Sequence, residues 1–137
     1  FPKNIVIEFC YVILFVRKVL FMKVIEVLKG REYSLSEIIE YYYKVIETEV
    51  TIDIEGNMDS RLVYGIQIDK ILIKKDGQQI TDSEKVEIIS CNLEFVREIC
   101  RTFHKQLVSP FHLIDILEDN ISASFRINSK IRFKEKV

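Results

Sequence analysis

Three residues near the C-terminal end have the best spacing for chemistry: His112, Asp115 and Asp119 follow one another at intervals of three and four. On an α-helix these intervals place an imidazole and two carboxylates on one side. Such groups bind metal ions or transfer protons, but zinc and non-haem iron sites usually take ligands from more than one segment. The only other histidine is His104. We interpret His112 as a structural residue at a helix start and expect no metal ion or other cofactor.

A second group of polar residues has the spacing to bind an anionic partner. It forms one stripe of an amphipathic segment and consists of Arg97, Arg101, His104 and Lys105. Glu94 and Glu98 lie at helical neighbour spacing from the two arginines, so the favoured interpretation is a solvated face whose charges neutralise one another. These four residues and the three above are the candidate binding residues.

Residues for covalent catalysis or phosphate binding do not form a recognisable pattern. Ser90 and Ser109 have the positions of caps, and Cys100 lies on an apolar helical stripe, where thiols are usually unreactive. The four glycines are scattered at 30, 56, 65 and 77, whereas phosphate-binding loops need glycines clustered before a helix. The pattern favours a protein that is not an enzyme and identifies no catalytic residue.

Alternating apolar and polar residues predict the strands that precede these candidates. The first covers 42–54, the second covers 62–73 with a bulge near Asp69 and Lys70, and the third lies near 86–89. Turns are predicted at 56–60 and 75–78, with a loop over 81–85, and Gly65 indicates the close approach of another backbone segment. Residues 22–40 fit either a short edge strand at 24–28 or a helical turn with capping spacing between Ser34 and Glu37.

Helical periodicity predicts two helices after the strands. Asn92 is the expected N-cap of the first, and Ser109 with Pro110 begins the second after a sharp corner. The apolar stripe of the first helix is Leu93, Val96, Ile99, Cys100, Phe103 and Leu107, and that of the second is Phe111, Ile114, Leu117 and Ile121. The predicted fold class is α+β: a small antiparallel three-stranded meander followed by two amphipathic helices packed on one face.

Length and charge predict one domain with two basic ends. The chain has 137 residues and a net charge of −1, but Lys3, Arg17 and Lys18 against Glu8 give residues 1–21 a charge of +2. Residues 123–137 carry +4, which leaves −7 for the body. We predict an apolar N-terminal extension over 1–21, a single α+β domain over 22–122 and a basic tail over 123–137. The acidic body argues against nucleic-acid binding outside the tail.

The apolar run at residues 5–16 has three interpretations. It contains Glu8 and is shorter than the roughly 20 residues that a membrane span needs, so a membrane is an expected partner only if residues 5–21 are a genuine anchor. The favoured hypothesis is a natural start at Met22; a buried amphipathic helix or strand is the other alternative. Cys10, Cys91 and Cys100 are an odd set without CxxC spacing, which favours the reducing cytoplasm.

Several segments resemble a family of short, uncharacterised bacterial proteins, a domain of unknown function. They are residues 43–50, 64–66, 89–90 and, above all, 108–119, which contain the closing signature Ser-Pro-x-His-Leu-x-Asp. Phe111 stands where isoleucine is expected in that signature. The resemblance covers residues 40–122 and implies a single compact domain that starts near Met22. It implies no activity, cofactor or catalytic residue.

The function that these features favour is that of a small, non-enzymatic, cytoplasmic module. It would bind a protein partner or a second copy of itself through an exposed sheet edge or the helical corner, or serve a regulatory role in this way. One alternative is a nucleic-acid accessory protein that uses the basic tail at 123–137. The other is a metal-dependent enzyme or sensor at His112.

Overall fold

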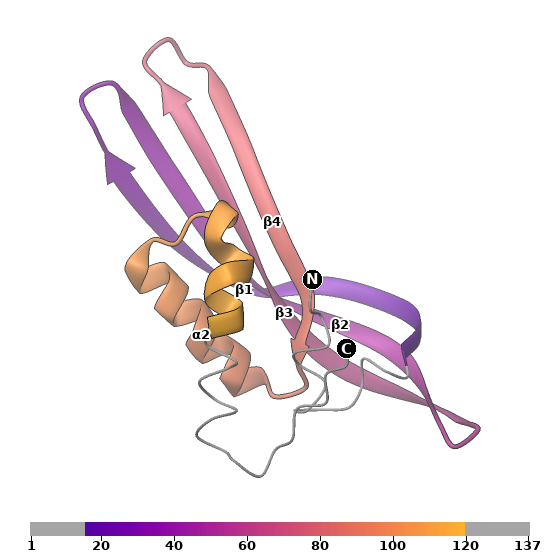
Figure 1. The fold of residues 1–137 in the computed structure, drawn as a ribbon. Helices are drawn as coiled ribbons and strands as arrows, with labels where there is room; N and C mark the ends of the chain where they lie inside the picture. Colours follow the sequence, from indigo (N-terminus) through magenta and orange to yellow (C-terminus); the bar gives the residue numbers. More distant parts are fainter. Residues whose placement is uncertain (1–15, 120–137) are drawn as a thin grey trace.

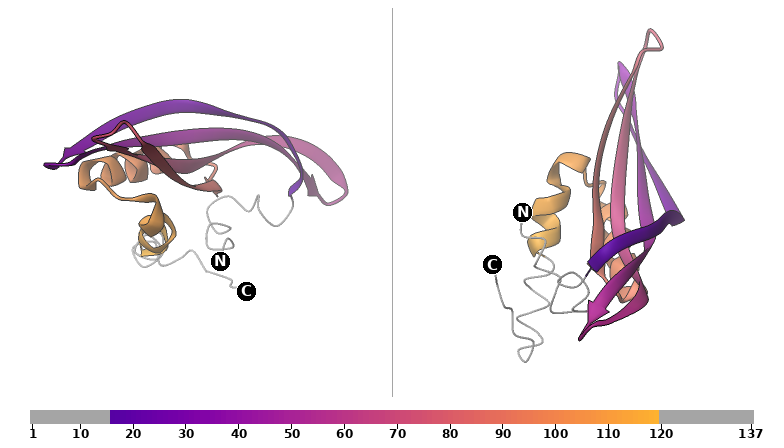
Figure 2. Two further views of the ribbon diagram at one scale, coloured as in Figure 1. Left: turned by 90° about the horizontal axis from the view of Figure 1, so that it is seen from above. Right: turned by 90° about the vertical axis from the view of Figure 1, so that its right-hand side faces the viewer.

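A four-stranded antiparallel sheet and a helical layer make up the computed structural model (Figure 1). It describes residues 16–119, without the side chains of 16–20, 52 and 54. The strands β1 (Val16–Tyr33), β2 (Glu37–Ile54), β3 (Asn57–Lys74) and β4 (Gln79–Ser90) lie in the sheet in chain order. The helix α2 (Leu93–Gln106) and the 3₁₀ helix η3 (Pro110–His112) follow, and residues 113–119 are helical. The curved sheet arches over the helices (Figure 2).

The predicted three-stranded meander is wrong, because β1 adds a full fourth strand, although the α+β class holds. The pairing of β1 with β2 shifts register between Val16 and Lys18, between Val19 and Phe21 and between Val24 and Glu26. Each shift reverses the faces to which the following side chains point, so no period-two pattern persists along the strand. The predicted short edge strand at 24–28 is only the middle of β1.

The other strands also extend beyond their predicted ends. β2 begins at Glu37, and the predicted loop at 81–85 is part of β4. Ser34 and Glu37 do not cap a helix but close the β1–β2 hairpin, where the Ser34 N–H donates to the Glu37 carbonyl at 2.9 Å and the Glu37 N–H donates to Ser34 Oγ at 3.2 Å. In Figure 1 the β1–β2 and β3–β4 hairpins extend beyond the helices. Polar residues persist in these parts of the strands because no helix covers them.

The bulge predicted near Asp69 and Lys70 is absent, because β2 and β3 pair without a shift from Glu37 opposite Lys74 to Ile54 opposite Asn57. The apolar residues of β3 change phase because they lie on different faces of the sheet. Ile71 and Ile73 are half-buried on the face away from the helices, and Ile66 and Ile68 are buried on the face toward them.

An irregularity does occur between β3 and β4, at Tyr64 and Ile66. There β4 crosses so close to Gly65 that a Cβ atom would lie 2.1 Å from the Val86 carbonyl oxygen and 2.3 Å from that of Glu87. The predicted close approach at Gly65 is confirmed.

The main core lies between the helix-facing side of the sheet and the helical layer. Its fully buried members include Tyr43, Val45, Ile66, Ile68 and Ile89 from the sheet and Val96, Phe103, Leu113 and Leu117 from the helical segments. The predicted stripe of α2 is therefore confirmed at its central positions. The predicted N-cap is also confirmed, because the Asn92 side chain accepts from the Phe95 N–H at 3.1 Å.

The helical corner is fixed by a close contact between α2 and β1. Leu107 has a φ of 50°, a left-handed conformation that costs a residue with a side chain about 1–2 kcal/mol. A Cβ atom on Gly30 would lie 2.5 Å from Leu107 Cδ2, so the glycine provides the space into which Leu107 packs. This packing offsets the strain and directs the chain back across the sheet. No helix in the described part of the chain is long and apolar enough to cross a membrane.

We expect Gly65→Ala to lower the free energy of unfolding by about 3 kcal/mol or more, because the methyl group would collide with backbone atoms that cannot rotate away. Urea unfolding followed by circular dichroism measures the effect. Gly77→Ala is the matched control: Gly77 has a φ of 88° but nothing within 4 Å, so only the conformational cost of about 1–2 kcal/mol applies. Equal losses in both variants would contradict the close approach.

Candidate functional site

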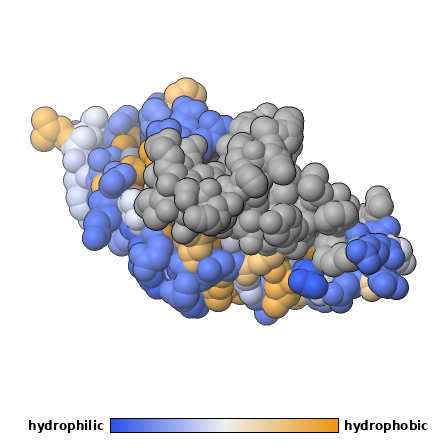
Figure 3. All heavy atoms as spheres, turned by 60° about the horizontal axis from the view of Figure 1, so that its bottom comes forward, coloured by the Kyte–Doolittle hydropathy of each residue, from blue (hydrophilic) through white to orange (hydrophobic). Residues whose placement is uncertain are grey.

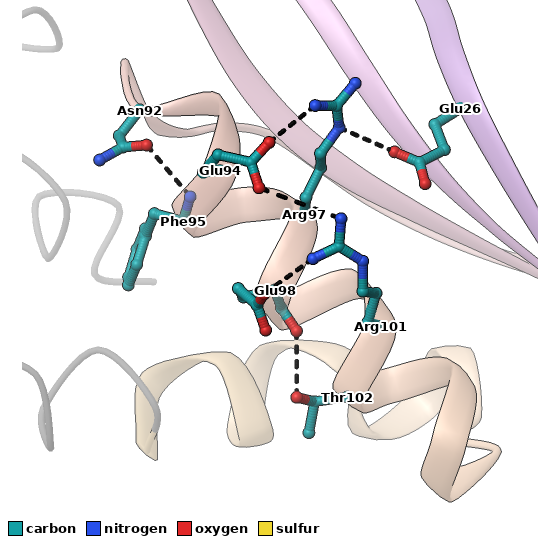
Figure 4. Close-up of polar contacts among 8 residues, drawn as sticks. All are labelled: Glu26, Asn92, Glu94, Phe95, Arg97, Glu98, Arg101 and Thr102. Carbon is teal, nitrogen blue, oxygen red and sulfur yellow. Dashed lines mark hydrogen bonds and ion pairs between the residues drawn. The ribbon is translucent and has the colours of Figure 1, made fainter.

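The arginines of the predicted anion-binding stripe are engaged in ion pairs (Figure 4). Arg97 donates from Nε to Glu26 of β1 at 3.0 Å and from a terminal nitrogen to Glu94 at 2.7 Å. Arg101 donates to Glu98 at 2.7 Å. Arg97 therefore ties α2 to the edge strand. The pairs of Glu94 and Glu98 with these arginines, which the helical spacing predicts, are present.

The other two residues of the stripe lie at the C-terminal end of α2. His104 donates from Nε2 to the Lys29 carbonyl oxygen at 2.7 Å, and its ring packs edge-on against Tyr43 with 5.8 Å between ring centroids. Lys105 is exposed. The four side chains thus share one helix, and His104 contacts the sheet.

His112, Asp115 and Asp119, the candidate set with helical spacing near the C-terminal end, are exposed at the helical corner. His112 ends η3 and packs edge-on against Phe111 at 5.2 Å, and Asp115 and Asp119 follow on the helical residues 113–119. Among residues 16–119 no three His, Cys, Asp or Glu side chains lie close enough together to hold a metal ion. Binding at these residues stays a prediction.

Two tyrosines of β2, Tyr41 and Tyr43, support the helical corner from the sheet. The Tyr43 hydroxyl is fully buried and donates to the Val108 carbonyl oxygen at 2.9 Å, and its ring stacks on Tyr41 at 6.0 Å. Burial raises the pKa of Tyr43, and burial together with the bond to Glu32 raises that of Tyr41 to about 12. Both hydroxyls therefore remain protonated and act as hydrogen-bond donors at neutral pH.

The sheet face away from the helices carries a polar network that joins three strands. Asp69 of β3 accepts from Lys44 of β2 at 2.6 Å, and it also accepts from Gln67 and from Ser83 of β4. Burial acts to raise the pKa of Asp69, but the hydrogen bonds from Gln67, Lys44 and Ser83 outweigh it and hold this pKa below its usual value. The network stabilises strand pairing and offers no unpaired cluster for chemistry.

A hollow of about 250 Å³ lies where the helical corner meets β3 and β4. We call its lining the corner surface; it comprises Lys70, Asp82, Ser83, Glu84, Ser109, Pro110 and Phe111. Pro110 is buried and anchors the corner, whereas Phe111 is 86% exposed at the edge of the hollow. The hollow combines one exposed aromatic ring with charged groups of both signs.

The predicted apolar stripe of the second helix is wrong at Phe111. The buried residues are Pro110, Leu113 and Leu117, so the covered side of the segment is turned away from Phe111. Ile114 is half-buried, and Ile121 lies outside the described residues. Two stripes, one starting at 110 and one at 111, fit the same sequence. A proline at the first helical position, which packs against the sheet, was the signal that favoured the first.

Comparison with known proteins places the chain in one family. A family model matches residues 22–123, and its description is a family of unknown function, DUF6514. The chain belongs to this family. DUF6514 membership agrees with the resemblance in its general form, and it assigns no activity. No curated protein matches the chain, and no solved structure does.

We expect Tyr43→Phe to lower the free energy of unfolding by about 1–2 kcal/mol, because it leaves the buried Val108 carbonyl without its donor. Denaturant unfolding measures the loss. Tyr42→Phe is the control, since the half-buried Tyr42 donates to Glu40 on the other face and its loss costs less than about 0.5 kcal/mol. A larger loss for Tyr42→Phe would contradict the role of Tyr43 in holding the corner.

We expect Asp69→Asn to cost about 1 kcal/mol at pH 7, with a smaller difference from the natural protein at acid pH. The folded state lowers the pKa of Asp69, so its charge stabilises the fold above the unfolded pKa of about 3.9 and this contribution is lost as the pH falls through the lower folded pKa. Urea unfolding at pH 7 and below pH 3 tests this, with exposed Asp82→Asn as the charge-matched control. A difference that does not change with pH would refute it.

Proposed function

We propose that this protein is a small, non-enzymatic module that binds a partner protein through the corner surface. The single observation that supports this proposal most is Phe111, whose side chain is 86% exposed although it lies next to the buried Pro110. A phenylalanine in this position adds little to the core. Its burial in a partner would contribute about 1.5–3 kcal/mol, which is typical of an aromatic residue at the centre of an interface.

The surroundings of Phe111 indicate what the partner offers. The hollow beside the ring is bordered by the exposed carboxylates of Asp82 and Glu84 and by the half-buried Lys70. An apolar centre with a charged rim is the usual composition of a protein interface. Two carboxylates against one amine favour a partner segment that carries an apolar side chain flanked by a basic residue.

Other exposed apolar side chains form separate groups. Among the coloured residues in Figure 3, hydrophobic ones emerge between hydrophilic ones. Leu35, at the end of the β1–β2 hairpin, is 98% exposed, and Met58, near the β2–β3 turn, is 60% exposed. Single exposed apolar side chains are common in folded proteins. Leu35 also borders a hollow, which lies between the β1–β2 hairpin and the end of β3. Phe111 differs because its hollow lies where the helical corner meets the sheet.

We also propose that the module works in a reducing cytoplasm, in bacteria as the resemblance implies. The odd number of cysteines supports this location. The absence of a catalytic role is supported at Cys100, since burial, with a further contribution from Glu26, raises the pKa of this thiol to about 12 and keeps it unreactive.

Affinity capture with the full chain as bait tests the proposal. We expect Phe111→Asp to lose a protein that the natural chain enriches from lysate, because a carboxylate would enter the apolar centre of the interface. Met58→Asp is the matched control, since it places the same charge on an exposed apolar position away from the corner and should retain that protein. A purified candidate then allows the affinity ratio to be measured, and we expect a loss of at least about tenfold.

The same eluates distinguish the alternative functions. Equal capture by the natural chain and by Phe111→Asp would contradict the corner surface as the binding site. Recovery of nucleic acid that disappears when residues 123–137 are deleted would favour the nucleic-acid accessory protein instead. That tail lies outside the described residues, so its role stays a prediction.

A further inference from the structure

The two edges of the sheet differ in how they are protected. At β4 the exposed positions near the start of the strand are polar or charged apart from Ile80, the strand pairs irregularly with β3 around Gly65, and η3 packs against it. At β1 the side chains of Phe21, Met22, Val24 and Val27 are each between 40% and 47% exposed. No described strand pairs with the outer edge of β1.

An exposed, apolar edge strand is a template for another strand, because its outward N–H and C=O groups lack partners within the sheet. Natural edge strands are usually protected by charges, and β1 carries Lys23 and Glu26 within its apolar stretch. These two charges are of opposite sign. They would repel a copy in a register that places like charges opposite each other and attract one in the register that places Lys23 opposite Glu26.

The register shift in β1 puts these two charges on the same face. Lys23 lies opposite Glu47 and Glu26 lies opposite Val45, and these β2 residues are two positions apart. Lys23 and Glu26 therefore both point to the helix side, where they contact Glu47 and Arg97. Residues three apart in a regular strand would point to opposite faces.

The same shift makes the neighbouring apolar residues self-complementary. Met22 lies opposite Thr48 and Val27 opposite Lys44, so both point away from the helices. Phe21 lies opposite Glu49 and Leu28 opposite Tyr43, so both point toward them. Each of these four residues thus shares a face with the one at the same distance on the other side of a point between Val24 and Ile25.

We propose that two copies of this chain pair antiparallel along β1, about a two-fold axis between Val24 and Ile25. Lys23 then faces Glu26 of the partner subunit, Met22 faces Val27 of the partner subunit, and Phe21 faces Leu28 of the partner subunit. A two-fold axis perpendicular to the sheet preserves its faces, so the two sheets become one with all helices on the same side. The pairing uses the edge opposite to the corner surface and does not depend on the proposed function.

Disulfide trapping tests the register. We expect Met22→Cys/Val27→Cys to form a covalent dimer under mild oxidation, because position 22 of each copy faces position 27 of the other. Within one chain these positions are about 16 Å apart along the strand, too far for a disulfide. Each single variant is the control, since like positions do not face each other across the axis, and neither should cross-link above the background of the three native cysteines.

Sedimentation equilibrium of the unsubstituted 137-residue chain tests the dimer itself, for which we expect twice the monomer mass of 16.2 kDa. Val24→Lys places two like charges beside the axis and should weaken the dimer at least about tenfold. Met58→Lys, an equally large change at an exposed site distant from β1, should not. Circular dichroism confirms that both variants are folded. A natural chain that stays monomeric, or a dimer that neither Val24→Lys weakens nor the cysteine pair traps, overturns the proposal.

Discussion

The unbroken pairing of β2 with β3 decides which side chains meet the helices and which meet the solvent. Over its whole length each residue of one strand keeps a partner on the other, so the two faces never exchange. Tyr43 and its partner Ile68 therefore lie on the face that α2 covers. Lys44 and Asp69 lie on the other face, where they form an ion pair although they are not direct partners in the pairing. The core, the polar network and the position of the corner all depend on this register.

Local signals made part of this arrangement predictable. The cap at Asn92, the apolar stripe of α2 and the close approach at Gly65 each depend on a few neighbouring residues, and each is confirmed. The ion pairs of Arg97 and Arg101 with neighbouring glutamates follow in the same way from helical spacing. The bond from Arg97 to Glu26 could not be predicted, because it joins positions 71 residues apart.

Competing patterns explain what the sequence did not reveal. In β1 the register shifts removed the alternation by which a strand is recognised. At the second helix two apolar stripes, one that starts at Pro110 and one that starts at Phe111, are equally regular in the sequence. Only packing against the sheet distinguishes them. The most exposed aromatic residue of the corner was therefore assigned to the core. Family membership could not correct this assignment, since DUF6514 has no known function.

The buried tyrosines have a practical consequence for how unfolding can be observed. The chain has six tyrosines and no tryptophan, so tyrosine dominates its near-ultraviolet signal. Tyr41 and Tyr43 hold their protons in the folded state because burial disfavours the phenolate, whereas a tyrosine in an unfolded chain ionises near pH 10. At a pH between about 10 and 12, additional phenolate absorbance from Tyr41 and Tyr43 would appear when the helical layer leaves the sheet. This signal needs no added label.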